Sequence, residues 1–154
     1  MDQLTERAKH LESCEDACLF PKSDLTEMRA EFERCWAWLW ASLCEFGPTH
    51  RKEHVWLRLS SRKAFLWPGK SCVIVGELIS WPIGLRDFNY WLQGGNLKEC
   101  CTLHRGIEQW ARMRGCHRAT GYGREGWARV MHGPWEKGTA TRIKWLVGEK
   151  REAI

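Results

Sequence analysis

The sequence lacks any apolar run long enough to cross a bilayer. Its longest such run, CWAWLWASLC at residues 35–44, falls well short of the roughly 20 residues that a membrane-spanning helix needs. The opening segment MDQLTERAKHLE is charged and has no apolar centre of the kind found in a signal peptide. We therefore expect no transmembrane helix and a protein that is made and folded in a cytoplasm.

The 8 cysteines lack the spacing of a metal or redox motif. None of them forms a C-x-x-C pair, which argues against a zinc ribbon or a thioredoxin-like site. In a cytoplasm the expected state is a set of mostly buried thiols. Because the count is even, disulfide bonds formed after release into an oxidising medium remain an alternative.

The nearest approach to a metal site is His10, Cys14 and Cys18, which fall at i, i+4 and i+8 on one face of a predicted helix. Cys101 and His104, three residues apart on a later helix, form a second partial set. Zinc prefers four ligands in a tetrahedral array, which neither set supplies. We predict packed or free thiols, no metal and no cofactor.

Charge of either sign is only weakly in excess. The 24 Lys and Arg residues against 19 Asp and Glu give a net charge of +5, and no basic run resembles a nucleic-acid-binding arm. A solvated surface is the predicted role of these charges. The alternative is a surface that stacks nucleic-acid bases between arginines. Its members would be Trp56, Arg58, Arg62, Lys63, Trp67, Arg112, Arg114 and Arg118.

Two helices are predicted at the start of the chain, as a hairpin within residues 1–48. The first covers residues 2–18, and the second begins at a cap, Ser23 or Asp24, and runs to about Glu45. The second helix is apolar around much of its circumference, which predicts burial on more than one side. Its apolar stripe is Met28, Phe32, Cys35, Trp36, Leu39, Leu43 and Phe46.

Tryptophan is abundant, with 11 residues in the chain. One small core cannot easily bury this many tryptophans, so we expect some of them at a surface that binds a protein partner. The candidates are Trp36, Trp38, Trp40, Trp81, Trp135 and Trp145.

From residue 54 the pattern changes to alternation, which predicts an antiparallel meander of four strands. The predicted strands cover residues 54–59, 64–67, 71–81 and 85–92. Asn96 then caps a helix that reaches Arg114, with a break near Gly106 and a stop at Gly115. The remaining predicted elements are a strand at 116–122, a helix at 123–131, a strand at 139–147 and a polar tail at 148–154.

The order of these elements resembles the core of the acetyltransferase-like (GNAT) fold. That resemblance implies an α+β protein, with the helical hairpin followed by an acetyltransferase-like mixed sheet with two helices over residues 54–147. Members of that family hold the acyl-CoA pyrophosphate between their fourth strand and the next helix, with a Gln/Arg-x-x-Gly-x-Gly/Ala motif. Here Gln93-Gly94-Gly95-Asn96-Leu97 stands at that place, without the family spacing.

A closer likeness is to small proteins of tailed bacteriophages and prophages, found among virion-assembly genes. The shared segments are LWPGK (66–70), the strand end at 91–95, IEQWARMRGC (107–116) and GREGWARV (123–130). This resemblance implies a degenerate acetyltransferase-like domain in a virion protein. We therefore predict a non-catalytic structural or assembly component that is made in the host cytoplasm, resides in the virion in many copies and binds other virion proteins.

The alternatives are an acetyl-CoA-dependent N-acyltransferase and a basic accessory protein that contacts packaged DNA. For acyl transfer the candidate bases are Glu77 and His117, the candidate acid is Tyr122, and the Gly123-x-x-Gly126 turn is a candidate anion site. Each of these residues also has an ordinary role in a strand or turn, and no Gly-x-Ser-x-Gly hydrolase motif is present. We predict no catalytic residue.

Overall fold

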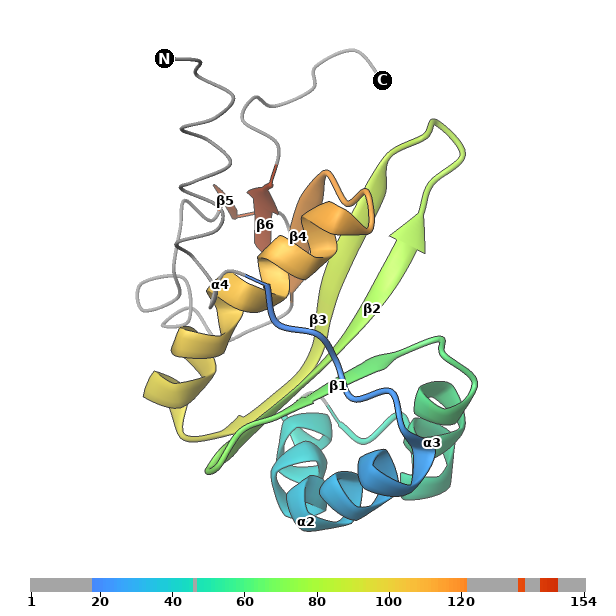
Figure 1. Ribbon diagram of the computed structural model, residues 1–154, viewed down its shortest axis with the longest axis vertical. Coiled ribbons are helices and arrows are strands. Elements are labelled where there is room, and N and C mark those ends of the chain that lie inside the picture. Colours follow the sequence, from blue (N-terminus) through green and yellow to red (C-terminus); the bar gives the residue numbers. More distant parts are fainter. Residues whose placement is uncertain (1–17, 46, 122–135, 138–141, 147–154) are drawn as a thin grey trace, which may run out of the picture.

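The structure is a computed structural model that describes residues 18–45, 47–121, 136–137 and 142–146. Within these residues it contains three helices and one six-stranded mixed sheet, which together make an α+β fold (Figure 1). None of the helices in this part of the chain combines the length and the apolarity needed to cross a membrane.

Helix α2 (Leu25–Cys44) is the second predicted helix, and its prediction is confirmed. The Asp24 side chain accepts a hydrogen bond from the backbone N–H of Glu27 at 2.8 Å, which caps the helix. The buried residues form a single stripe at every third or fourth position, Met28, Phe32, Cys35, Leu39 and Leu43, so the predicted burial on more than one side is wrong. Trp36 of the predicted stripe is half-buried. Phe46 and the first predicted helix lie outside the described residues.

The predicted strand at 54–59 is wrong, because this segment is helix α3 (Lys52–Ser60). Val55 and Leu59 are buried one helical turn apart, whereas Leu57 is 64% exposed. Apolar residues at 55, 57 and 59 are compatible with a strand, and those at 55 and 59 also with one face of a short helix. Packing against α2 favours the helix. The backbone N–H of Arg51 donates to His54 Nδ1 and helps to start it.

The meander therefore has three strands, not the four predicted. Strands β1 (Phe65–Pro68), β2 (Cys72–Ser80) and β3 (Arg86–Gly95) pair antiparallel in sequence order. Strand β4 (Arg118–Gly121) pairs parallel to β3, and β6 (Arg142–Trp145) pairs antiparallel to β4. With the two-residue strand β5 (Glu136–Lys137), the sheet order is β1-β2-β3-β4-β6-β5.

Helix α4 (Leu97–Met113) connects the parallel strands β3 and β4. The Asn96 side chain caps it, and Gly115 follows its end with a φ of 81°, both as predicted. The predicted break at Gly106 is wrong, because the helix passes through it without interruption. Gly106 is buried, and its carbonyl accepts a hydrogen bond from the backbone N–H of Leu19 at 2.9 Å.

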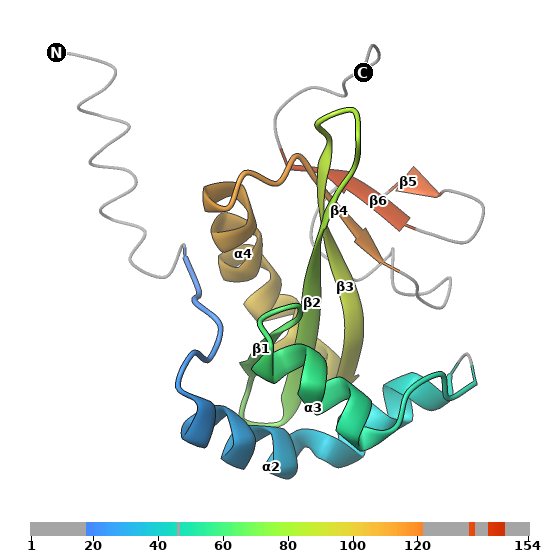
Figure 2. The ribbon, with the colours of Figure 1, turned by 90° about the vertical axis from the view of Figure 1, so that its right-hand side faces the viewer.

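Helices α2 and α3 cover one face of the sheet, and α4 covers the other (Figures 1 and 2). Alternate side chains of β2 lie on opposite faces of the sheet. Val73 and Val75 pack under α2, whereas Cys72 and Ile74 pack under α4. A β-bulge in β3 shifts the register between Val75 and the residue after it.

Residues 18–24, which we call the strap, connect the two faces along the outer edge of β1. Lys22 donates its backbone N–H to the Leu66 carbonyl, and Trp67 donates its indole N–H to the Leu19 carbonyl at 2.9 Å. The strap thus occupies edge groups of β1 that would otherwise be free to pair with another strand.

The predicted segments 1–48, 54–147 and 148–154 stay a prediction. The predicted helix at 123–131 and the residues Tyr122, Gly123, Gly126 and Trp135 lie outside the described residues.

Candidate functional site

The turn from Gln93 to Leu97, the candidate phosphate cradle, is filled by the protein's own backbone. A Cβ on Gly94 would lie 2.4 Å from the carbonyl oxygen of Trp38 in α2. A Cβ on Gly95, which has a φ of 91°, would lie 2.3 Å from the carbonyl oxygen of Ser71. These glycines therefore allow two close backbone contacts, which explains both of them without a ligand.

Polar groups around this turn already have partners. Gln93 donates its backbone N–H to Ser42 Oγ at 3.1 Å, and Asn96 donates its own to the Ser71 carbonyl at 2.7 Å. The Glu99 carboxylate accepts the backbone N–H of Ser71 at 3.0 Å. A carboxylate of the protein thus lies in the first turn of α4, where the helix dipole favours an anion.

The two candidate bases are held by different partners. Glu77 is half-buried and accepts hydrogen bonds from the guanidinium of Arg58 and from Asn89 Nδ2. His117 accepts the backbone N–H of Arg86 at its Nδ1 atom, 3.0 Å away. Each base is therefore engaged in joining neighbouring elements, and Tyr122 lies outside the described residues.

Sequence reasoning missed two polar rows that cross the sheet on the α2 side. In the first, Thr120 of β4 donates to Asn89 of β3 at 3.0 Å, and Asn89 donates to Glu77 of β2 at 3.2 Å. Glu77 is bound in turn by Arg58 of α3, so this row runs through three strands to a helix.

In the second row, Arg118 of β4 donates to both carboxylate oxygens of Asp87 in β3, at 2.5 and 3.1 Å. Trp81 donates its indole N–H to the same carboxylate at 2.8 Å. Asp87 is 1% exposed, so it depends on these donors for the solvation that burial removes. Together the two rows fix the register in which β3 and β4 pair.

Sequence reasoning also missed a buried polar cluster under α4, formed by Tyr90, His104, Glu108 and Lys144. Glu108 accepts the Tyr90 hydroxyl at 2.6 Å and pairs with the Lys144 ammonium at 2.5 Å. His104 contacts the Tyr90 ring, with 4.7 Å between ring centroids, and its Nε2 atom lies 2.6 Å from Gln93 Oε1. Burial raises the pKa of Tyr90 and lowers that of Lys144, the latter against the opposing effect of Glu108.

Of the metal candidates, the structure describes Cys18, Cys101 and His104. Cys18 contacts the Met113 sulfur at 3.2 Å, and His104 belongs to the buried cluster. His10 and Cys14 lie outside the described residues. Among the residues that the structure describes, no three His, Cys, Asp or Glu side chains are grouped to hold a metal ion.

All five arginines of the nucleic-acid alternative contact other residues of the protein. Arg58 and Arg118 pair with carboxylates, and Arg62 donates to the carbonyl of Ser23. Arg112 donates to the Leu146 carbonyl, and the Arg114 guanidinium lies over the rings of Phe65 and Trp110. DNA contact by this set stays a prediction, and it would have to compete with these internal contacts.

Three tryptophans of α2 and α3 form a surface that we call the α2–α3 aromatic surface: Trp36, Trp40 and Trp56. Trp36 and Trp56 each lie 5.5 Å from the ring of the buried Phe32, and Trp36 lies 6.1 Å from Trp40. Trp40 is 42% exposed, and the other two are half-buried.

Cations lie over the rings of this surface. The Arg29 guanidinium is 4.9 Å from the Trp56 ring, and the Lys52 ammonium is 5.7 Å from the Trp36 ring. Both cations pair with Glu33, and the Lys52 hydrogen bond is the main cause that lowers the pKa of that carboxyl. The surface is therefore an ordered arrangement of tryptophans and cations around one carboxylate.

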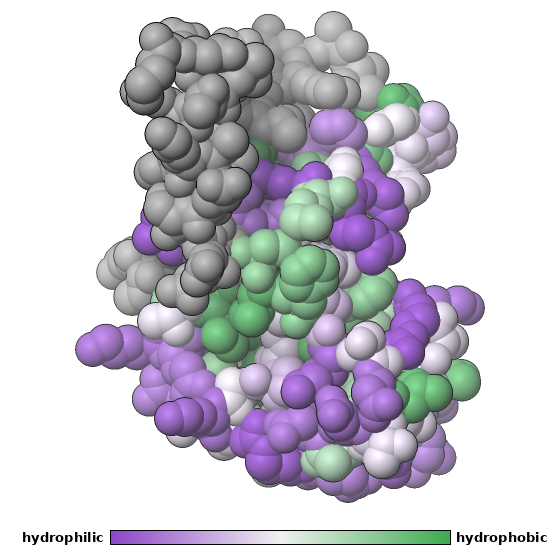
Figure 3. All heavy atoms as spheres, in the orientation of Figure 1, coloured by the Kyte–Doolittle hydropathy of each residue, from purple (hydrophilic) through white to green (hydrophobic). Residues whose placement is uncertain are grey.

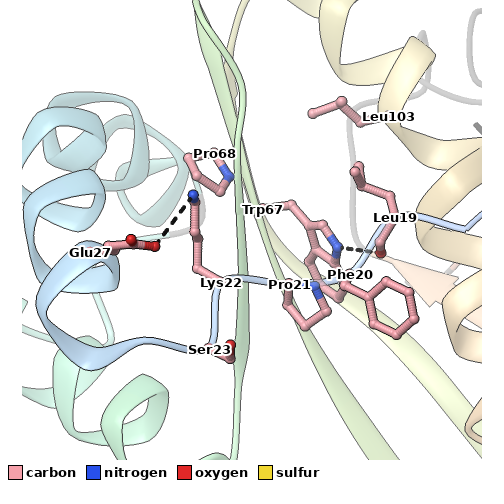
Figure 4. Close-up of a pocket in the computed structure, with 9 residues that line it drawn as sticks. All are labelled: Leu19, Phe20, Pro21, Lys22, Ser23, Glu27, Trp67, Pro68 and Leu103. Atoms are coloured by element: carbon pink, nitrogen blue, oxygen red, sulfur yellow. Dashed lines mark hydrogen bonds and ion pairs between the residues drawn. The ribbon is translucent and has the colours of Figure 1, made fainter.

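A second apolar surface lies beside α4. Figure 3 shows apolar residues gathered in the middle of the viewed face, next to α4 and the strap. An open pocket of about 450 Å³ lies between the strap and β1 (Figure 4). Phe20, Trp67 and Leu103 line one side, and the Lys22–Glu27 pair, with 4.0 Å between the charged atoms, lines the other.

Comparison of the chain with models of protein families, with curated proteins and with solved structures finds no match.

Proposed function

We propose that this protein is a non-catalytic structural or assembly component of a bacteriophage virion, and that it binds other virion proteins through the α2–α3 aromatic surface. The observation that carries the proposal is the aromatic cluster in which Trp36 and Trp56 pack on Phe32 and Trp40 packs on Trp36. The resemblance of four segments of the chain to phage virion-assembly proteins supplies the biological setting.

Protein interfaces are enriched in tryptophan and arginine, and their centres are depleted of lone carboxylates. The aromatic surface has this composition, because its single central carboxylate, Glu33, is paired with Arg29 and Lys52. Its tryptophans are also ordered before binding by their contacts with one another and with Phe32. Less conformational entropy is then lost when a partner covers them.

The contacts at the predicted cradle support a role without catalysis. Gly94 and Gly95 touch the backbones of Trp38 and Ser71, and the Glu99 carboxylate lies at the N-terminus of α4. We propose that the domain has an acetyltransferase-like arrangement, with β3, α4 and β4 as its central unit, whose anion-binding turn now serves packing.

The proposal is tested by measuring how much of the protein is present in particles purified from a host that carries its gene. We expect the protein in purified particles in many copies, and we expect Trp40→Ala to reduce its incorporation by about tenfold, as loss of a central interface tryptophan does. Ile83→Ala is the control, because Ile83 is an apolar residue that is 58% exposed at the β2–β3 turn, outside the α2–α3 aromatic surface. Absence from particles, or equal incorporation of both variants, would contradict the proposal.

The acyltransferase alternative is favoured by one observation, the parallel pairing of β3 and β4 with α4 between them. Isothermal titration of the protein with acetyl-CoA decides between the two. Micromolar binding of acetyl-CoA would favour the alternative and overturn the structural proposal.

A further inference from the structure

The outer edge of β2 is open over residues 77–80. Strand β1 pairs with β2 only as far as Gly76, whereas β3 pairs with β2 as far as Ser80. Figure 1 shows β2 and β3 continuing past β1 as a two-stranded arm. Arg62, with a φ of 61°, turns the chain between α3 and β1, and β1 begins only at Phe65. In the part of the chain that the structure describes, residues 77–80 therefore have a strand partner on one side only.

The backbone groups of Leu78 and Ser80 face outward at this open edge. Trp81 donates its backbone N–H to the Leu85 carbonyl, which makes these two residues a hydrogen-bonded pair of the antiparallel ladder. Such pairs alternate along a ladder, so the N–H and C=O groups of Leu78 and Ser80 point away from β3. No other described residue bonds to them. They are therefore available to a further strand, as at any unpaired sheet edge.

The side chains beside the open edge are apolar on the α4 side of the sheet. Leu78 and Phe65 are half-buried and pack against the cluster under α4, where the Phe65 ring lies 4.9 Å from the ring of Trp110. A strand added to the edge would place every second side chain on this face, next to Leu78. The edge therefore suits a strand with an apolar residue at that position.

Basic side chains without a carboxylate partner among the described residues surround the edge. Lys63 and Arg114 are exposed, and the Arg114 guanidinium lies 5.6 Å from the centre of the Phe65 ring. Arg86 stands opposite Ser80 on β3, and its Nε atom is buried without a hydrogen-bond acceptor in the described structure. These cations are therefore available to acidic groups of a partner.

The carboxylates of the arm do not offset this charge. Glu77 of β2 pairs with Arg58, and Asp87 of β3 pairs with Arg118. A second copy of the chain at this edge would bring like charges together, which is unfavourable. Charge complementarity therefore favours a different, acidic occupant.

We propose that the open edge of β2 binds an extended, acidic segment of a partner protein, which adds to the sheet as a further strand beside residues 77–80. Backbone hydrogen bonds to Leu78 and Ser80 supply affinity in this mode, and the side chains that flank them supply selectivity. No residue of the α2–α3 aromatic surface takes part, so this inference goes beyond the function proposed above and does not depend on it.

Titration of the full chain with two synthetic peptides of equal length tests the proposal. Both peptides alternate valine with a charged residue, which is glutamate in the first and lysine in the second. Fluorescence anisotropy of labelled peptides measures their affinity. We expect the glutamate peptide to bind more tightly than the lysine peptide by about tenfold, because only the first complements the basic edge. Equal binding of the two peptides, or no binding of the glutamate peptide, would overturn the proposal.

Ser80→Pro removes one outward N–H group at a position where an edge strand tolerates proline. Loss of one hydrogen bond should weaken binding of the glutamate peptide by about fivefold. Ser80→Ala is the matched control, because it keeps the N–H group and should bind as the wild type does. Trp40→Ala should also leave this binding unchanged, which separates the edge from the aromatic surface. An equal loss in Ser80→Pro and Ser80→Ala would contradict strand addition.

The charge argument has its own pair of variants on α4. Arg114→Gln should narrow the difference in affinity between the two peptides. Arg105→Gln, at another exposed arginine of the same helix, should leave that difference unchanged. Equal effects of the two variants would show that net charge, and not the edge, selects the acidic peptide.

Hydrogen exchange of the wild-type chain gives a readout that needs no variant. In the free protein the amides of Leu78 and Ser80 should exchange faster than that of Ile79, which faces β3, and the glutamate peptide should slow them. Unchanged exchange at both amides in the presence of the bound peptide would overturn the proposal. So would a free protein that is a dimer and that Ser80→Pro dissociates, because a second copy would then be the occupant.

Discussion

The two sides of the sheet solve the problem of burial in different ways. The cluster under α2 and α3 consists of apolar side chains, such as Phe32, Leu39 and Val75, and some of its aromatic rings lie at the surface. The Asp87–Arg118 row crosses the same face of the sheet outside this cluster. The core under α4 contains a buried ion pair between Glu108 of α4 and Lys144 of β6, both at most 4% exposed.

The two clusters therefore contribute differently to the stability of the fold and to the choice of one arrangement of its elements. Apolar contacts under α2 stabilise many similar arrangements, because one apolar side chain replaces another at modest cost. The ion pair under α4 tolerates one arrangement, since a charge buried without its partner is strongly unfavourable. We infer that the α4 side fixes how β6 joins the sheet, whereas the α2 side leaves a surface free for binding.

The largest expected effect comes from breaking the ion pair. Lys144→Met leaves the buried Glu108 carboxylate without its ammonium partner, with the Tyr90 hydroxyl still donating to it, and should lower the free energy of unfolding by about 3–5 kcal/mol. Urea unfolding followed by tryptophan fluorescence measures this.

The double variant Lys144→Met/Glu108→Leu is the control. With both charges gone, most of the lost stability should return, because apolar groups of similar volume replace a buried pair at little cost. If the double variant is as unstable as the single one, packing around Lys144 and not its charge makes the α4 side specific.

A smaller effect is expected where β3 passes under α2. Gly94→Ala places a Cβ 2.4 Å from the Trp38 carbonyl oxygen and should cost about 1–3 kcal/mol. Gly121→Ala is the matched control, because its Cβ would meet the nearest side-chain atom at 3.6 Å, an ordinary contact. Equal stability of the two variants would show that α2 is not pressed against β3.

Helices α2 and α4 were predictable because their signals are local. Asp24 and Asn96 each cap the helix that follows, and Gly115 follows the end of α4. The segment that became α3 was not predictable, because its few apolar positions fit two periods and only contact with α2 chooses between them.

The polar contacts were out of reach for a different reason. Asp87 and Arg118 are 31 residues apart, and they meet only because α4 returns the chain parallel to β3. Gly94 illustrates the converse, since a glycine before a helix fits both a phosphate site and a close backbone contact. The sequence contains the residues for both outcomes, and only the position of α2 separates them.

The smallest expected effect compares one buried thiol on each side. Burial raises the pKa of Cys35 under α2 and of Cys116 under α4 to about 11, from 9.0. A raised pKa in the folded state stabilises the protein fully below pH 9 and is lost as pH rises toward 11, because the unfolded chain ionises first.

Replacing either thiol should therefore flatten the alkaline loss of stability by the same amount. Under reducing conditions, Cys35→Ala and Cys116→Ala should each reduce the fall in unfolding free energy between pH 8 and pH 10 by about 1 kcal/mol. If unfolding free energy changes with pH equally in the two buried variants, burial disfavours the thiolate equally on both sides of the sheet. The two cores would then differ in their ion pair and not in how strongly they exclude water. A flatter slope for Cys35→Ala alone would place the drier core under α2.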